Sequence, residues 1–309
     1  MPASLYARLL PVLLTAVALA APAGAEPLDT WTWRGVEPAG KPGQPNYEDI
    51  AHEAGNLVVV GNSGTILRRK LTDSTWTATD AGTTAPLYGL AVANGTFFAT
   101  GAKGTILSSR NGAAWTPRDS EVGVPLFDVM YTDSVFVAIG EGGTIVTSRV
   151  GGMWSIHPSR VIESLHGATF ARGIFLSVGS NGTILTSDDG SYWLEQVSGT
   201  RRTLFGVAAG PSIFVAVGEN GTLLTSPNGT DWTPRPAGTT RSLYGVAYGA
   251  GTFVVVGAGG TILTSTDGLI WKPRTLEVSP FLKDVTFTGM SFWAVGWNGA
   301  ILESGPFAK

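Results

Sequence analysis

The chain has 309 residues, no cysteine and a net charge of −3, with 20 basic and 23 acidic side chains. The lack of cysteine excludes disulfides and thiolate metal sites, and the slightly acidic balance argues against nucleic acid, whose binders carry strongly basic surfaces. The stability of the fold must therefore come from packing.

Residues 1–25 have the layout of a cleavable signal peptide. One charge, Arg8, precedes an apolar run from Leu9 to Ala21, and small residues at 23–25 offer a cleavage site. The alternative, a membrane anchor, requires about 20 apolar residues, which this run does not reach before Pro22. We expect cleavage after Ala25, a secreted or periplasmic mature chain, and no membrane insertion once the signal is removed.

A short phrase then recurs seven times along the rest of the chain. It first reads Gly61-Asn-Ser-Gly-Thr-Ile-Leu67, and its first glycine returns after 40 residues and then five times at steps of 39. The later copies begin at Gly101, Gly140, Gly179, Gly218, Gly257 and Gly296. A repeat of this period predicts stacked supersecondary units, as in a solenoid or a propeller.

Each unit is predicted to be a four-stranded antiparallel sheet. Residues 241–274 show four short runs rich in aromatic and β-branched residues, separated by turn residues. The runs are apolar on both faces, as expected when neighbouring sheets pack face to face. Between the third and fourth runs, Asn-Gly or Asp-Gly pairs predict tight hairpins, followed by a tryptophan. These tryptophans are 39 residues apart: Trp76, Trp115, Trp154, Trp193, Trp232 and Trp271.

The seventh unit lacks its fourth strand, and the missing strand is found near the other end of the chain. Trp31-Thr-Trp-Arg34 matches Trp232-Thr-Pro-Arg235 of a complete unit. We therefore predict an all-β fold in which an N-terminal strand completes the last blade of a single seven-bladed β-propeller, residues 26–309. An open solenoid is the alternative. Prolines 117, 234 and 273 fall in the predicted outermost strands, where a missing amide donor costs least.

Loops that lead into the innermost strands are expected to converge around the axis on one face. We predict that the residues entering these strands bind a ligand or partner, stacking a sugar or gripping a peptide side chain. The alternative is packing between blades. These residues are Glu48, Tyr88, Phe127, His166, Phe205, Tyr244 and Lys283.

One position further along each inner strand lies a ring of small or acidic residues. Asp49, Asp128 and Asp284 lie there in three blades, with glycine in the other four, and carboxylates suit a hard cation such as calcium. Only two of the three lie in adjacent blades, so we predict no metal and no cofactor.

Four arginines fall in the loops before blades 4, 5 and 6 and are expected to form a basic crescent on the same face: Arg160, Arg201, Arg202 and Arg241. Guanidinium groups bind carboxylates in a fixed fork, which would suit an acidic peptide or an acidic sugar. Solvated surface charge is the alternative.

The hairpins resemble the Asp-box, or bacterial neuraminidase repeat, of β-propellers. Ser187-Asp-Asp-Gly-Ser-Tyr-Trp193 is a shortened form, with one residue fewer between Asp and Gly. With the Gly-x-x-Gly-Thr-Ile-Leu phrase, the chain is similar from about Trp31 to Leu302 to seven-bladed propellers of the photosystem II stability and assembly factor type and to related secreted bacterial propellers. In that assembly factor an arginine patch meets the client. The resemblance implies that Arg201, Arg202 and Arg241 could play this part here.

The Asp-box resemblance also suggests a sialidase-type glycosidase, which requires an arginine triad and a Tyr–Glu nucleophile pair. Tyr88, Tyr244, Glu48 and Glu163 supply ingredients, but the family's Arg-Ile-Pro signature is missing and the loops are short and uniform. We predict a non-enzymatic, monomeric binding or scaffold protein for a protein partner or an extracellular polymer, peptide or glycan, with no catalytic residue. A glycan-binding protein or a sialidase-type hydrolase is the alternative.

Overall fold

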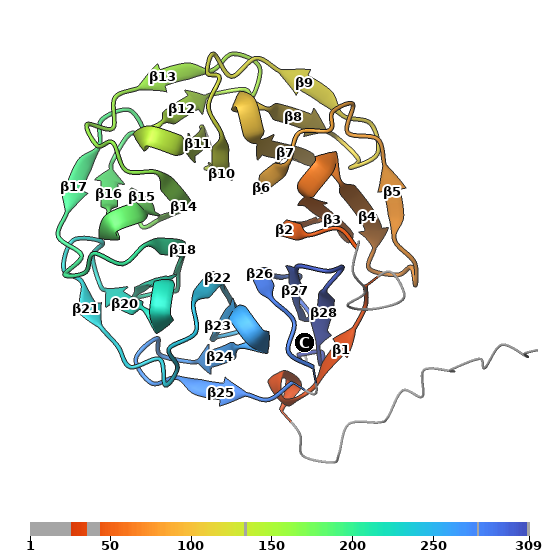
Figure 1. Ribbon diagram of the computed structural model, residues 1–309, viewed down its shortest axis with the longest axis vertical. Coiled ribbons are helices and arrows are strands. Elements are labelled where there is room, and N and C mark those ends of the chain that lie inside the picture. Colours follow the sequence, from red (N-terminus) through yellow and green to blue (C-terminus); the bar gives the residue numbers. More distant parts are fainter. Residues whose placement is uncertain (1–25, 36–43, 133–134, 277, 308–309) are drawn as a thin grey trace, which may run out of the picture.

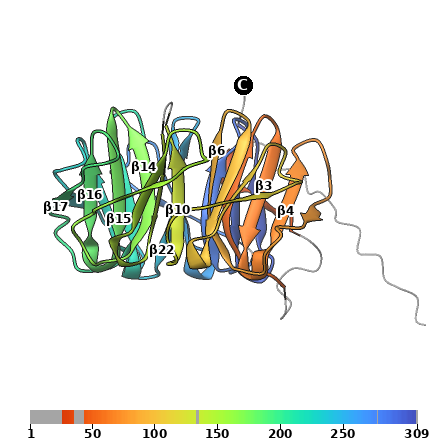
Figure 2. The same cartoon turned by 90° about the horizontal axis from the view of Figure 1, so that it is seen from above.

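The computed structural model describes residues 26–35, 44–132, 135–276 and 278–307, and these form a closed ring of seven four-stranded sheets (Figure 1). Seen from the side, the ring is a flat disc (Figure 2). The predicted seven-bladed propeller is thus confirmed. The predicted signal peptide, residues 1–25, lies outside the described residues. Within the described part of the chain, no helix is long and apolar enough to cross a bilayer.

Each blade is an antiparallel meander that runs from the axis to the rim. The innermost strands are β2 (Tyr47–Glu53), β6 (Leu87–Ala93), β10 (Leu126–Tyr131), β14 (Leu165–Ala171), β18 (Leu204–Ala209), β22 (Leu243–Gly249) and β26 (Leu282–Phe287). The second strands are β3 (Asn56–Gly61), β7 (Thr96–Gly101), β11 (Phe136–Gly140), β15 (Ile174–Gly179), β19 (Phe214–Gly218), β23 (Thr252–Gly257) and β27 (Phe292–Gly296).

The third strands are β4 (Ile66–Lys70), β8 (Ile106–Ser109), β12 (Ile145–Ser148), β16 (Ile184–Ser187), β20 (Leu223–Ser226), β24 (Ile262–Ser265) and β28 (Ile301–Ser304). The outermost strands are β5 (Thr77–Thr79), β9 (Thr116–Arg118), β13 (Ser155–His157), β17 (Leu194–Gln196), β21 (Thr233–Pro234), β25 (Lys272–Arg274) and β1 (Trp31–Trp33).

The recurring glycine phrase forms the turn between the second and third strands. In blades 1 to 6 it is a short 3-10 turn whose middle residue is left-handed, as at Asn181 (φ 55°). Gly182, which follows it, is also left-handed (φ 74°), and a Cβ there would press against the Thr200 carbonyl of the next loop. These two requirements explain why glycine recurs in the repeat. The turns are η2 (Asn62–Gly64), η3 (Ala102–Gly104), η4 (Glu141–Gly143), η5 (Ser180–Gly182), η6 (Glu219–Gly221) and η7 (Ala258–Gly260).

The hydrophobic core is divided among the interfaces between neighbouring blades. Val58 and Val60 of blade 1, for example, are fully buried against Phe97 and Leu107 of blade 2. Similar clusters of buried residues lie between the other neighbouring blades around the ring. The prediction that the strands are apolar on both faces because sheets pack face to face is confirmed.

The hairpins between third and outer strands are held by a recurring set of bonds. In blade 4, Gly190 donates its amide to the Ser187 hydroxyl (2.9 Å), and Asp189 Oδ1 accepts from the amides of Ser191 and Tyr192. The Trp193 indole donates to the Gly190 carbonyl at 3.0 Å, which seals the turn. Trp115, Trp232 and Trp271 make the same bond in their blades.

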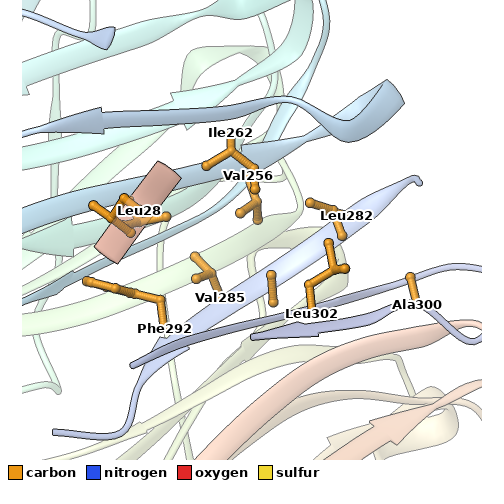
Figure 3. Packing of buried hydrophobic residues seen from close by; sticks show 10 residues of the cluster. Leu28, Val256, Ile262, Leu282, Val285, Phe292, Ala300 and Leu302 are labelled. Atoms are coloured by element: carbon orange, nitrogen blue, oxygen red, sulfur yellow. The ribbon is translucent and has the colours of Figure 1, made fainter. Parts of the chain in front are cut away.

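The ring closes as predicted, through pairing of the N-terminal strand with the last one. β1 lies beside β28 in the order β1-β28-β27-β26, with Trp31 opposite Ser304 and Trp33 opposite Leu302. The turn before β1, η1 (Pro27–Asp29), inserts Leu28 into the core between blades 6 and 7 (Figure 3). The N-terminal strand therefore ties two blades together.

The outermost strands differ in how they protect their free edges. Pro117, Pro234 and Pro273 lie in β9, β21 and β25, as predicted, and a proline offers no amide to a passing strand. The outermost strands of the other four blades have no proline, among them β13 and β17 of blades 3 and 4. There, Ile156 of β13 and Leu194 of β17 are 58% and 51% exposed.

Leu28→Ala is expected to lower the free energy of unfolding by about 2–5 kcal/mol, because it leaves a cavity at a side chain that is 4% exposed. Leu269→Ala, at a residue 41% exposed in a hairpin, is the control and should cost less than about 0.5 kcal/mol. Urea unfolding of residues 26–309 measures both. Equal midpoints for the two variants would show that Leu28 does not stabilise the contact between the N-terminal turn and blades 6 and 7.

Candidate functional site

A β-bulge near the start of every inner strand sets the geometry of the central channel. In blade 1 the pairing shifts between Tyr47 and Asp49, so that Glu48 is the additional residue, and the same shift occurs in the other six blades. A bulge re-aims side chains that would otherwise alternate between faces. Consecutive residues such as Glu48 and Asp49 therefore both line the axis.

The seven residues predicted to enter the inner strands form one ring, which we call the mouth ring: Glu48, Tyr88, Phe127, His166, Phe205, Tyr244 and Lys283. They surround one end of a central cavity of about 450 Å³. All seven side chains are half-buried, whereas the core side chains between blades are buried. The structure thus places these residues together; whether they bind a ligand remains a prediction.

The ring side chains touch one another from blade to blade. Ring centroids are 5.6 Å apart for Tyr88 and Phe127, and 5.2 Å for Phe127 and His166. The distances are 5.8 Å from His166 to Phe205 and 4.8 Å from Phe205 to Tyr244. The result is an unbroken arc of aromatic surface across blades 2 to 6.

An ion pair continues the ring between blades 7 and 1. The Lys283 ammonium lies 3.4 Å from the Glu48 carboxylate and 4.9 Å from the centroid of the Tyr244 ring. Burial raises the pKa of Glu48, and the nearby Lys283 opposes that shift. The nearby side chain of Trp297 also acts to lower the pKa of Glu48.

Two aromatic residues that the sequence analysis did not single out extend this surface toward the rim. Phe281 packs on Tyr244 at 4.8 Å, and Trp297 stacks on Phe281 at 4.1 Å with 13° between the ring planes. Both line a second cavity of about 470 Å³ together with Trp33, Val278 and Pro280. The sequence does mark Trp297 as exceptional, because the equivalent residues in the other copies of the phrase are all small or polar.

Below the mouth ring, three carboxylates join neighbouring blades. Asp49 accepts the amide of Leu90 in blade 2 at 2.6 Å, and Asp128 accepts that of Ala168 in blade 4 at 2.8 Å. Asp284 accepts the amide of Ile50 in blade 1 at 3.4 Å. These oxygens are therefore used to connect blades, and among the described residues no group of three acidic, histidine or cysteine side chains could hold a metal ion.

The glycines at the same level allow the inner strands to approach closely. A Cβ on Gly89 would lie 2.7 Å from the Cα of Asp128, and one on Gly245 would lie 2.7 Å from the Cα of Asp284. Gly167 and Gly206 are equally crowded by the backbone of the next blade. Close approach of the neighbouring backbone therefore explains why blades 2, 4, 5 and 6 have glycine at this level.

Burial changes the protonation of these central groups. Removal from water raises the pKa of Asp128 to about 8, with a contribution from the charge of Asp49. Burial also raises the pKa of Asp284 well above its usual value, and Asp49 adds to this shift as a hydrogen-bonded neighbour. Burial lowers the pKa of His166 to about 4, so its imidazole is neutral at neutral pH.

The predicted basic crescent is only partly formed. Arg202 donates to the Asn220 carbonyl at 3.2 Å, and Arg241 donates to the Gly259 carbonyl at 2.5 Å, so both are anchored on the 3-10 turns beside the mouth. Arg201 is exposed in the loop next to Arg202. Arg160 does not belong to this group, because its guanidinium lies 4.8 Å from the Tyr192 ring on the hairpin at the other end of blade 4.

Comparisons with solved structures agree with this fold. YCF48 bound to D1 peptide is 17% identical, with a TM-score of 0.74 over 93% of this chain and 99% of that one. YCF48 from Cyanidioschyzon merolae is 16% identical, with a TM-score of 0.72 over 89% of this chain and 98% of that one. Virginiamycin B lyase from Staphylococcus aureus is 12% identical, with a TM-score of 0.78 over 89% of this chain and 99% of that one. No protein-family model and no curated protein matches the sequence.

At these identities the similarity establishes a shared fold. The resemblance to propellers of the photosystem II assembly factor type, expected from the repeats, is confirmed at this level by the likeness to YCF48. The chain is similar in fold both to binding proteins and to a lyase, so its function has to be argued from its own site.

Asp128→Asn is expected to reduce the pH dependence of stability. The folded chain keeps a proton on Asp128 up to about pH 8, whereas an unfolded chain loses it near pH 4. The stability that this residue contributes is therefore complete below about pH 4 and is lost as the pH rises through about 8, by up to about 1.4 kcal/mol per pH unit. Asparagine does not titrate and keeps one of the two oxygen acceptors, so the loss of one amide bond, from Val129 or Ala168, adds a cost that does not vary with pH.

The measurement is the difference in free energy of unfolding between wild type and variant across this pH window, which cancels the opposing effect of His166. The variant should gain on wild type as the pH rises. The exposed Glu195→Gln is the control for loss of one negative charge. A difference that does not vary with pH would show that Asp128 is ionised throughout.

Proposed function

We propose that the chain is an exported, non-enzymatic binding propeller that engages a protein partner through the face bearing the mouth ring. The observation that carries the proposal is the arc of half-exposed aromatic side chains from Tyr88 to Trp297 around an open cavity. Aromatic residues are enriched at the centres of protein interfaces, where few contacts supply most of the binding energy.

The asymmetry of the ring supports binding over a purely structural role. Packing between blades repeats in all seven units, but the mouth ring carries an acid at Glu48, a neutral imidazole at His166 and a cation at Lys283. A partner has no sevenfold symmetry, so a specific site requires such differences. YCF48, which shares this fold, was solved with a bound peptide, and that likeness favours a peptide segment as the occupant.

Two features speak against the sialidase arrangement. A tyrosine nucleophile requires activation, whereas burial raises the pKa of both Tyr88 and Tyr244. Nor do the arginines form a triad around the cavity, because Arg202 and Arg241 donate to backbone carbonyls and Arg160 is turned to Tyr192.

A glycan is the second candidate ligand, favoured by one specific observation. Trp297 is 38% exposed and lies almost parallel to Phe281, which gives a flat aromatic platform of the kind on which a sugar ring can stack. A binding experiment that presents peptides and glycans side by side distinguishes the two.

Peptide and glycan arrays should be probed with residues 26–309 and with a Phe127→Ala, Phe205→Ala variant. We expect peptide binding, and a loss of affinity of about 10-fold or more in the variant, since each exposed ring contributes contact area. Phe170→Ala is the matched control, at a 39% exposed phenylalanine near the other end of an inner strand. Equal loss in both variants, or none in either, would exclude the mouth as the binding site.

Arg202→Glu, Arg241→Glu tests the rim separately. Both side chains are exposed while anchored to carbonyls, so charge reversal is expected to weaken acidic ligands and leave neutral ones unchanged. A fluorogenic sialoside assay completes the comparison. Turnover that disappears in Tyr244→Phe or Tyr88→Phe would replace this proposal with the glycosidase alternative.

A further inference from the structure

The central cavity contains more acidic than basic groups. Four carboxyl groups line it, from Glu48, Asp49, Asp128 and Asp284, and Lys283 is the one ammonium group among its lining residues. The two histidines in the lining, His52 and His166, have pKa values lowered by burial and so carry no charge that could compensate. When these carboxyl groups are ionised, the cavity is therefore complementary to a cation.

The chain's own lysine shows that a cation fits against this aromatic surface. Lys283 places its ammonium over the Tyr244 ring while pairing with Glu48. An aromatic face attracts a cation through its quadrupole. Lys283 thus supplies the positive charge on the side of the cavity formed by blades 6, 7 and 1.

The opposite side has the same aromatic lining without a cation. Asp128 lies between blades 2 and 4, beneath the arc formed by Tyr88, Phe127 and His166, with Gly89 against its backbone. Its oxygens accept the amides of Val129 and Ala168. Among the described residues that line the cavity, no cationic side chain pairs with this carboxyl group, so its ionised form has no countercharge.

We infer that this side of the mouth takes a cationic group of the partner, a guanidinium or an ammonium, against the exposed faces of Tyr88 and Phe127 and above the Asp128 carboxyl. The inference rests on the proposed function and specifies its ligand. Arginine is the stronger candidate of the two, because its planar guanidinium stacks on aromatic rings and is weakly hydrated.

Occupation by a cation should be coupled to proton release. The pKa of Asp128 is about 8, so near neutral pH the group is mostly protonated, and an arriving cation favours its ionised form. The other titratable groups facing the channel are Glu48, Asp49 and His52 on β2, Tyr88 on β6, His166 on β14, Tyr244 on β22, and Lys283 and Asp284 on β26. Affinity is therefore expected to rise as the pH increases from about 6.5 to about 8.5.

The test uses two blocked peptides, acetyl-Gly-Gly-Arg-Gly-Gly-amide and its counterpart with citrulline, which keeps the shape of arginine without its charge. Residues 26–309 are titrated with each by NMR and calorimetry at both ends of this pH range. We expect the arginine peptide to bind about 10-fold more tightly than the citrulline peptide, more tightly at the higher pH, and with protons released to the buffer. Asp128→Asn should remove the preference, the pH dependence and the proton release.

Two further variants test the inference independently, in case Asp128→Asn does not fold. Phe127→Leu should weaken the arginine peptide while retaining the pH dependence, and the exposed Glu195→Gln on β17 should bind as wild type does. Equal affinity for the two peptides, or no shift in mouth resonances with either, would overturn the inference. If an array-selected peptide still binds and still loses affinity in Phe127→Ala, Phe205→Ala, the proposed function stands while the cation site falls.

Discussion

Face-to-face packing of neighbouring sheets is the interaction on which this molecule depends. Every blade has two apolar faces, so each face must be covered by another blade, and a row of such sheets always leaves two faces open unless it closes on itself. The interface between blades 7 and 1 covers them by burying Tyr47 against Trp293 and Val295. The ring is the geometry that satisfies this requirement, and the pairing of β1 with β28 keeps it shut.

The same closure creates the central cavity. The inner strands leave little room for side chains where they meet around the axis. Glycines in four blades and bulges in all seven allow the strands to approach this closely. The three aspartates at this level act as connectors between blades, at the cost of burying carboxyl groups in a space with a single lysine. Structure and binding potential therefore come from the same residues, because groups that join the blades also set the charge of the cavity.

Most of the fold could be predicted from the sequence, because a repeat of 39 residues places equivalent residues in equivalent positions. Register alone was enough to assemble the mouth ring, from Glu48 to Lys283. Register could not predict side-chain contacts that occur in one blade and are not repeated in the others. The direction of Arg160 depends on Tyr192 of the next blade, and the stacking of Trp297 on Phe281 occurs in blade 7 only. The charge state of Asp128 could not be read either, since it depends on burial and not on spacing.

The position of the seam also determines how the ring responds to force. Trp31 lies opposite Ser304 at one end of the β1–β28 pair and Trp33 opposite Leu302 at the other, so both chain ends leave from the same end of an antiparallel pair. Tension applied to the two ends would load the backbone bonds one after another, as in unzipping, where each bond breaks alone. Once Leu28 is withdrawn from the core, the toroid would thus open by separation of β1 from β28, with the six complete blades still folded.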